Sequence, residues 1–143
     1  MIRYIACFIT LIHISFILSA QDTVTQKIVI FPKEKGVHAA NDSPTSRFTP
    51  ITDEIKMVDE IVKAHIKEKY PQASNVLVDN YYRQYYGSIL MGQRIIFING
   101  CCTKPEKFTE EMYFAKGGGN CYFNAKINLQ TKKIMSFRFN AGK

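Results

Sequence analysis

The sequence predicts an α+β fold in which one long helix packs on a curled antiparallel sheet of four to five strands, arranged as a meander. Residues 51–70 carry apolar side chains at helical spacing, whereas the segments after Pro71 alternate apolar and polar side chains, as strands do. Short connections join these later segments, which favours strands that are neighbours in both sequence and space. The apolar stripe of the helix and the apolar face of the sheet both need cover, and we expect them to cover each other.

The predicted helix occupies residues 51–70. Thr49 is the expected N-cap, with Pro50 at the first helical position. Asp59 and Lys63 are expected to form an i,i+4 ion pair on the solvent side of this helix. The stripe that faces the sheet consists of Ile51, Ile55, Val58, Val62, His65 and Ile66.

The strands are expected at 76–86, 94–99, 109–116, 121–129 and around 135–139. The first of them is expected to end at Gly87, and Gly117–Asn120 is expected to form a hairpin turn. Side chains predicted to face the helix are Cys121, Phe123, Ala125, Ile127, Leu129, Met135, Phe137 and Phe139. Residues 94–99 are apolar on both faces, which indicates either dimerisation or cover by a β-prone segment at 24–31.

The first 20 residues have the pattern of an export signal. Arg3 gives a positive start, an apolar run extends from Ile5 to Leu18, and small residues stand at Ser19 and Ala20. Since about 20 apolar residues are needed to span a bilayer, cleavage after Ala20 is favoured over an uncleaved membrane anchor. The expected location is therefore secreted or periplasmic.

The domain organisation follows from this signal. After the signal peptide at 1–20, residues 21–50 are expected to form a β-prone segment and a polar linker. Residues 51–143 are then expected to form a single α+β domain.

The formal net charge of +7 indicates an acidic partner. For an exported chain we expect an unknown protein or an anionic glycan or other envelope component, and no nucleic acid. Contact with a membrane is expected only through an uncleaved signal. The alternative is that the charge serves solubility alone.

Three cysteines follow the signal: Cys101, Cys102 and Cys121. In a simple meander that includes a strand at 109–116, Cys102 and Cys121 lie at opposite ends of the sheet, roughly 24 Å apart. A disulfide needs Cα atoms within about 7 Å, so this topology excludes a bridge to Cys121. If such a bridge does form, the segment after Cys102 folds back or the strand order differs.

The order of a β-prone segment, a long helix and antiparallel strands over residues 24–140 resembles the cystatin-like and nuclear-transport-factor-2-like architectures. The two hairpin regions read Tyr86-Gly87-Ser88-Ile89-Leu90-Met91-Gly92-Gln93 and Cys101-Cys102-Thr103-Lys104-Pro105-Glu106. Neither contains the Gln-x-Val-x-Gly or Pro-Trp motif of cystatin inhibitors, so cysteine-protease inhibition is not implied. The resemblance does imply a cone-shaped domain that can hold a pocket between helix and sheet.

The exposed face of the sheet is the predicted binding site. Tyr rings combined with Asn, Lys and Arg are typical of recognition surfaces. The candidate residues are Tyr82, Tyr122, Asn124, Lys126 and Arg138. For the 81–86 strand, alternation leaves open whether Tyr82, Gln84 and Tyr86 or Tyr81, Arg83 and Tyr85 share this face. The alternative is an ordinary solvated sheet face.

The sequence thus predicts a non-catalytic exported binding or accessory module, with no catalytic residue, metal site or cofactor. Two further function classes compete with it. The alternative is a small-ligand-binding or enzymatic domain with a pocket lined by His65 or Asp79. The inward faces of the predicted strands are apolar, which favours a filled core and hence the binding module. The third possibility is a structural domain anchored by an uncleaved signal.

Overall fold

The computed structural model describes residues 26–35, 46–73 and 76–142. The elements follow the chain in the order β1 (Ile28–Ile30), β2 (Arg47–Phe48), α1 (Thr52–Lys69), β3 (Tyr82–Leu90), β4 (Gln93–Cys101), β5 (Tyr122–Asn128) and β6 (Lys133–Phe139). Short 3-10 turns occur at Pro71–Ala73, Val78–Asn80 and Gly119–Cys121. The predicted signal at 1–20 lies outside the described residues.

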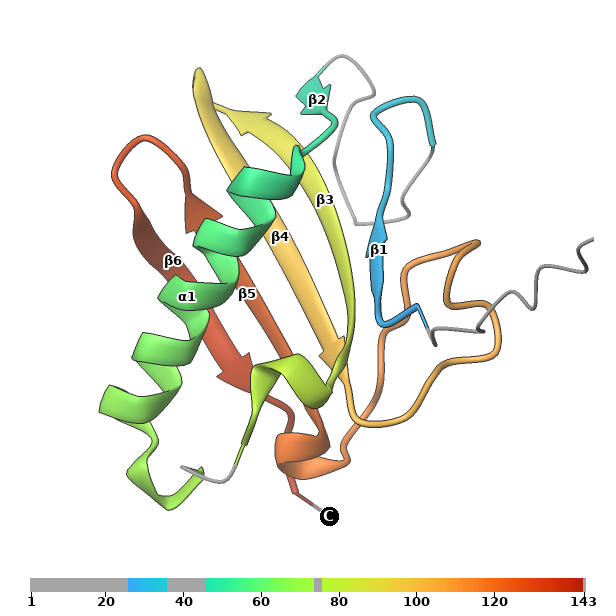
Figure 1. The fold of residues 1–143 in the computed structure, drawn as a ribbon, viewed down its shortest axis with the longest axis vertical. Coiled ribbons are helices and arrows are strands. Elements are labelled where there is room, and N and C mark those ends of the chain that lie inside the picture. Colours follow the sequence, from blue (N-terminus) through green and yellow to red (C-terminus); the bar gives the residue numbers. More distant parts are fainter. Residues whose placement is uncertain (1–25, 36–45, 74–75, 143) are drawn as a thin grey trace, which may run out of the picture.

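The six strands form one open, mixed sheet with the helix on one side (Figure 1). Strands β3 to β6 make the expected antiparallel meander. β1 pairs in parallel with the N-terminal half of β3, and β2 pairs antiparallel with its C-terminal half. The α+β class and the single long helix are therefore confirmed, whereas a purely antiparallel sheet of four to five strands is wrong. β1 can pair in parallel because α1 provides the crossover that parallel strands require.

The main core lies between α1 and the sheet. The helix buries its predicted stripe from Ile55 through Val58 and Val62 to Ile66. Ile51, which was predicted to begin this stripe, is exposed because it precedes the first turn of the helix. The sheet contributes Ile96 and Ile98 of β4 and the predicted inward residues Phe123, Ala125 and Ile127 of β5. His65 packs at the margin of this core, with its ring centroid 5.1 Å from that of Phe137.

The opposite face of the sheet, which we call the outer face, is covered in part by residues 102–121. Phe108 from this loop is buried with Val29, Phe31 and Tyr86, and Phe97 packs against them. These contacts explain why residues 94–99 are apolar on both faces. Of the two alternatives that the sequence left open, cover by the β-prone segment is present through Val29 and Phe31, and the loop adds to it.

Residues 109–116 do not form the predicted strand, and they belong to this loop instead. Three buried or half-buried amide side chains hold its backbone. Gln84 donates to the carbonyl oxygens of Phe108 and Glu111, Asn99 donates to that of Tyr113, and Asn140 donates to those of Ala115 and Gly117. Likewise, Gly117–Asn120 leads into a 3-10 turn rather than connecting two strands as a hairpin.

Because the chain folds back over the outer face, both ends of the loop meet at the end of β4. Cys101 pairs with Tyr122 across β4 and β5, and a disulfide joins Cys102 to Cys121 with Cα atoms 5.0 Å apart. The prediction that the topology excludes a Cys121 bridge is therefore wrong. Its error was the assumed strand at 109–116. Cys101 remains a buried thiol, and burial raises its pKa to about 12.

Three predictions about the strands also need correction. β3 begins at Tyr82 rather than at residue 76 and continues through Gly87 to Leu90. A Cβ at Gly87 would lie 2.6 Å from the Phe48 carbonyl oxygen, so this glycine allows β2 to approach and does not end the strand.

Met135 of β6 was predicted to face the helix, but it is exposed. The register shifts at this residue, since Ser136 and Ile134 stand opposite consecutive residues of β5.

The N-terminus of α1 also differs from the prediction. The helix starts at Thr52 with Ile51 as N-cap, and the Ile51 amide donates to the Glu54 carboxylate at 3.1 Å. Thr49 instead accepts a hydrogen bond from the Lys33 amide, which ties the chain before the helix to the turn after β1. No helix among the described residues is long and apolar enough to cross a membrane.

Candidate functional site

The predicted binding residues all lie on the outer face. Asn124 and Lys126 of β5 point away from the core, and Arg138 stands directly opposite Asn124 on β6. The open choice on β3 is resolved as well. Tyr82, Gln84 and Tyr86 share the outer face, whereas Arg83 and Tyr85 point toward α1.

Three of these residues line a shallow depression of about 270 Å³, together with Ser136 and Phe137. The Arg138 Nε group donates to the Asn124 side-chain oxygen at 3.0 Å. The Lys126 ammonium lies 4.8 Å from the centre of the Phe97 ring, in a cation–π contact. We call Asn124, Lys126, Ser136 and Arg138 the basic depression.

Tyr122 precedes the basic depression on β5, whereas Tyr82 lies two strands away on β3, and both rings contact the loop. The Tyr82 ring packs edge-on against buried Phe108, and the Tyr122 ring lies 5.9 Å from that of Tyr113. Both rings are half-buried. Their predicted place on the face is right, but their main contacts are with the covering loop.

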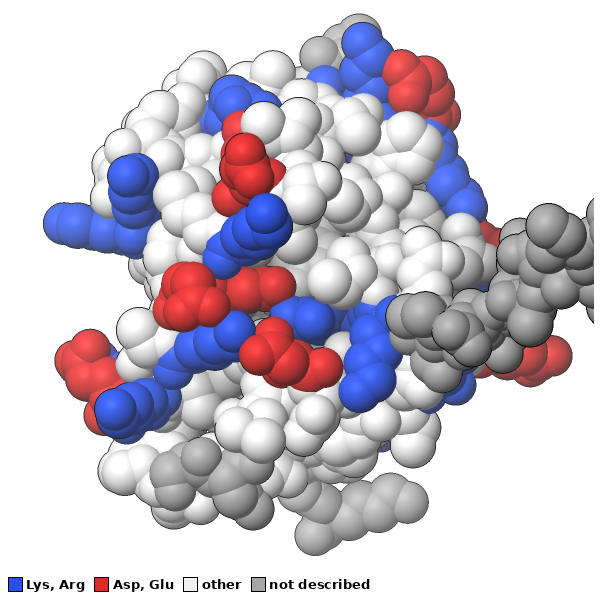
Figure 2. Space-filling view, viewed as in Figure 1, with Lys and Arg blue, Asp and Glu red and all other residues white. Residues whose placement is uncertain are grey.

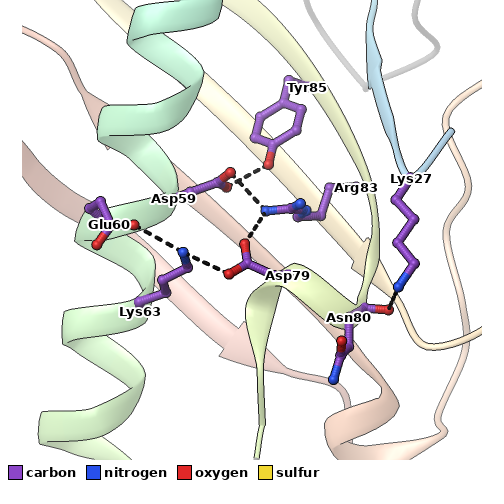
Figure 3. A network of polar contacts seen from close by, with 8 residues as sticks. All are labelled: Lys27, Asp59, Glu60, Lys63, Asp79, Asn80, Arg83 and Tyr85. Atoms are coloured by element: carbon purple, nitrogen blue, oxygen red, sulfur yellow. Dashed lines mark hydrogen bonds and ion pairs between the residues drawn. The ribbon is translucent and has the colours of Figure 1, made fainter. Parts of the chain in front are cut away.

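A second group of polar residues lies on the helix side, where the sequence predicted a simple surface ion pair. Asp59 is buried, and its carboxylate accepts hydrogen bonds from Tyr85 at 2.5 Å and from Arg83 at 2.7 Å (Figure 3). Lys63 bonds Asp79 and Glu60 instead of Asp59. The predicted Asp59–Lys63 pair is therefore wrong, because Asp59 points to β3 rather than along the helix.

This group, which we call the α1–β3 network, also includes an Asp79–Arg83 contact of 3.3 Å. Burial raises the pKa of Asp59, although the Tyr85 hydrogen bond and the Arg83 charge oppose this effect. The hydrogen bond from Lys63 lowers the pKa of Asp79. In Figure 2 the acidic and basic side chains alternate in a band across this side of the molecule. Each charged group of the network contacts at least one group of opposite sign, and these contacts join α1, the Val78–Asn80 turn and β3.

Two open grooves flank the α1–β3 network. The larger, of about 970 Å³, lies between β1 and the first half of α1, and its lining includes Ile28, Ile30, Ile55, Asp59 and Arg83. The smaller, of about 310 Å³, lies beside the second half of α1 and the Val76–Asp79 segment. Asp79 lines both, as predicted for a helix–sheet pocket, whereas His65 lines neither of them.

The sequence interpretation missed Asp59, Arg83 and Gln84 as buried polar residues. A signal was present for Asp59, which directly follows Val58 and so stands next to the apolar stripe of the helix. Burial lowers the pKa of His65, as expected for an imidazole packed between rings. Among the described residues no cluster of three His, Cys, Asp or Glu side chains could hold a metal ion.

Comparison with known proteins gives no family assignment. No family model, curated protein or solved structure matches this chain significantly. The candidate sites therefore rest on their own geometry.

Proposed function

We propose that this protein is an exported, non-catalytic binding module that recognises anionic sugar units of an envelope glycan through the basic depression. The observation that carries this proposal is the pairing of two exposed cations with amide and hydroxyl groups in one small concavity. Lys126 and Arg138 supply charge, while Asn124 and Ser136 supply directional hydrogen-bonding groups.

The charges of the basic depression are available to a ligand. Within the described residues, neither Lys126 nor Arg138 is in ion-pair contact with a carboxylate. The two residues are diagonal neighbours on antiparallel strands, which are separated by roughly 7–8 Å, with their Cβ atoms somewhat closer. A single carboxylate, sulfate or phosphate group fits between such side chains.

The surroundings suit a sugar ring. Tyr122 precedes Asn124 by two positions on the same face, and its half-buried ring adds amphipathic surface of the kind that contacts sugars. These groups project from hydrogen-bonded strands rather than from a loop, which lowers the ordering cost of binding. Export is supported by the predicted signal, and the Cys102–Cys121 disulfide agrees with an oxidising compartment.

A glycan array tests this proposal. Labelled protein is applied to neutral, sulfated, phosphorylated and uronic-acid glycans, and we expect retention on one or more of the anionic classes. Lys126→Glu and Arg138→Glu should each weaken binding by at least about tenfold, because each replaces attraction by repulsion. Lys67→Glu is the matched control, since it makes the same charge change on the exposed helix surface.

The outcomes are distinct. Loss of binding in both depression variants, with melting temperatures close to that of the wild type, supports the proposal. If the unmodified protein binds no anionic glycan, or if Lys67→Glu weakens binding as much as Lys126→Glu does, the basic depression is not the site.

A second candidate function is binding of a small ligand in the larger groove, because Asp79, one of the two residues expected in a pocket between helix and sheet, lines it. The affinity for such a ligand should not change in the Lys126→Glu variant. Thr52→Arg, at the exposed rim of the groove, would instead obstruct it.

A further inference from the structure

The turn between β3 and β4 carries an apolar residue where solvent exposure is greatest. Met91 is 104 % exposed, and Ile89 just before it is 38 % exposed. Leu90 pairs with Gln93 across the hairpin, so Met91 and Gly92 alone form the turn. The side chain of Met91 therefore projects from the tip of the hairpin into solvent.

Met91 also has an unfavourable backbone conformation. Its φ is +50°, and Gly92 follows with φ of +75°, as in two-residue turns that favour Asn-Gly or Asp-Gly. A left-handed backbone is uncommon for residues other than Gly, Asn and Asp. Neither the fold nor solubility gains from methionine at this position. Residues that violate local preferences without a structural gain are expected at functional sites.

Ile51 extends the apolar surface at this end of the sheet. It is 60 % exposed, and the Glu54 carboxylate links it to the hairpin, because this carboxylate accepts from both the Ile51 amide and the Arg94 guanidinium. Arg94 directly follows Gln93 in β4. We call Ile51, Ile89, Leu90 and Met91 the apolar tip.

Basic residues stand beside the apolar tip, on the turn between β5 and β6. This turn lies against β4, since the Arg94 amide donates to the Gln130 side chain and Asn128 donates to that of Gln93. Lys132 and Lys133 are exposed in this turn. Both turns lie at the same end of the sheet in Figure 1, and Figure 2 shows basic side chains projecting on the side of the β5–β6 turn.

We propose that the apolar tip docks on the surface of an anionic lipid bilayer. Met91 and Ile89 enter the boundary between headgroups and acyl chains, while Lys132 and Lys133 lie beside the lipid phosphates. Apolar side chains flanked by lysines are the combination that binds anionic membrane surfaces. This contact is separate from the basic depression and does not depend on the proposed glycan binding. It adds a membrane contact beyond the one expected through an uncleaved signal.

Tryptophan fluorescence tests the docking, because the chain contains no Trp. Met91→Trp places a single reporter at the tip, and Leu77→Trp places a matched reporter at another exposed apolar position. The full chain is used, so that residues 1–20 are common to both variants. Vesicles of phosphatidylcholine alone are compared with vesicles that contain equal amounts of phosphatidylcholine and phosphatidylglycerol.

With the anionic vesicles, we expect the emission of the Met91→Trp variant to shift to the blue and to be protected from acrylamide. The emission of the Leu77→Trp variant should remain unchanged. Adding Lys132→Asn and Lys133→Gln to Met91→Trp should raise the lipid concentration for half of the shift at least about fivefold. Asn suits the left-handed backbone at position 132, where φ is +53°, so the turn is preserved.

Three results would overturn the proposal. The first is an unchanged emission of the Met91→Trp variant with both kinds of vesicle. The second is an equal shift in the Leu77→Trp variant, which would indicate anchoring through a part shared by both variants. The third is a shift of the tip reporter on addition of a partner protein but not of vesicles, which would assign the apolar tip to a protein interface.

Discussion

Asp59 and Arg83 form an ion pair that is almost completely buried, between the middle of α1 and the start of β3. Burial of two charges costs several kcal/mol for each ion, and their attraction roughly offsets this cost when the geometry is good. The Tyr85 hydroxyl and the Asp79 carboxylate supply the additional hydrogen bonds. The net stabilisation by the intact pair is thus small, whereas an unmatched partner would be costly.

We therefore expect Asp59→Asn to lower the free energy of unfolding by about 3 kcal/mol, since it leaves the Arg83 charge buried without its main partner. Urea denaturation measures this change. Lys63→Met is the control, because Lys63 is partly exposed and its ion pairs should contribute less than about 1 kcal/mol. The double variant Asp59→Leu with Arg83→Met should recover at least half of the loss. Equal effects of Asp59→Asn and Lys63→Met would contradict the structural role given to the α1–β3 network.

At the scale of elements, the loop at 102–121 depends on amide side chains rather than on a neighbouring strand. Gln84 is completely buried and makes three hydrogen bonds to the loop backbone. Its Nε2 group donates at 2.6 and 2.8 Å, and its Oε1 atom accepts from the Tyr113 amide at 2.9 Å. One side chain of β3 thus replaces the backbone partners that a sheet neighbour would offer.

Gln84→Ala should cost about 3 kcal/mol of unfolding free energy, because it leaves one buried and two partly buried backbone groups without partners. Hydrogen exchange should show the loss of protection first at the Tyr113 amide. Gln93→Ala is the matched control, since Gln93 is exposed and accepts a single side-chain hydrogen bond. A similar loss in both variants would mean that Gln84 does not hold the loop.

The loop also shows where sequence patterns are sufficient and where they fail. The helix and the β5 alternation could be predicted because burial of one face imposes a fixed period on the side chains. Residues 109–116 were predicted as a strand from their composition, but their backbone is bonded by Gln84 and Asn99, which are distant in the sequence. No local pattern specifies such partners. The parallel pairing of β1 likewise depends on the crossover through α1 and not on the three residues of β1.

The candidate site, too, could be predicted from the sequence only where its strands are regular. Asn124, Lys126 and Arg138 could be placed on one face because β5 and β6 are regular at these positions. The role of Tyr82 in packing against Phe108 could not be predicted, since it requires the loop to fold back over the outer face. No local sequence pattern marks the register shift at Met135.

At the scale of the whole molecule, the sheet has two covers of different kinds. α1 covers one face through a large core, and residues 102–121 cover part of the other through the smaller cluster around Phe108. The Cys102–Cys121 disulfide closes this loop. The loop also contacts the strand that carries Asn124 and Lys126, because the Tyr113 ring lies 5.9 Å from that of Tyr122 in β5. The disulfide thus links the stability of the loop to its place on the outer face.

The linkage predicts the effect of removing the disulfide. Its two cysteines are separated by 19 positions, and closing a loop of this size stabilises the folded chain by about 3 kcal/mol. Cys102→Ser with Cys121→Ser should lower the free energy of unfolding by this amount. Hydrogen exchange should show faster opening of residues 102–121 than of β3 to β6, because α1 still covers the main core. Cys101→Ala is the control that leaves the bridge intact. Uniform loss of protection across the whole sheet would instead mean that the loop and the main core unfold as one unit.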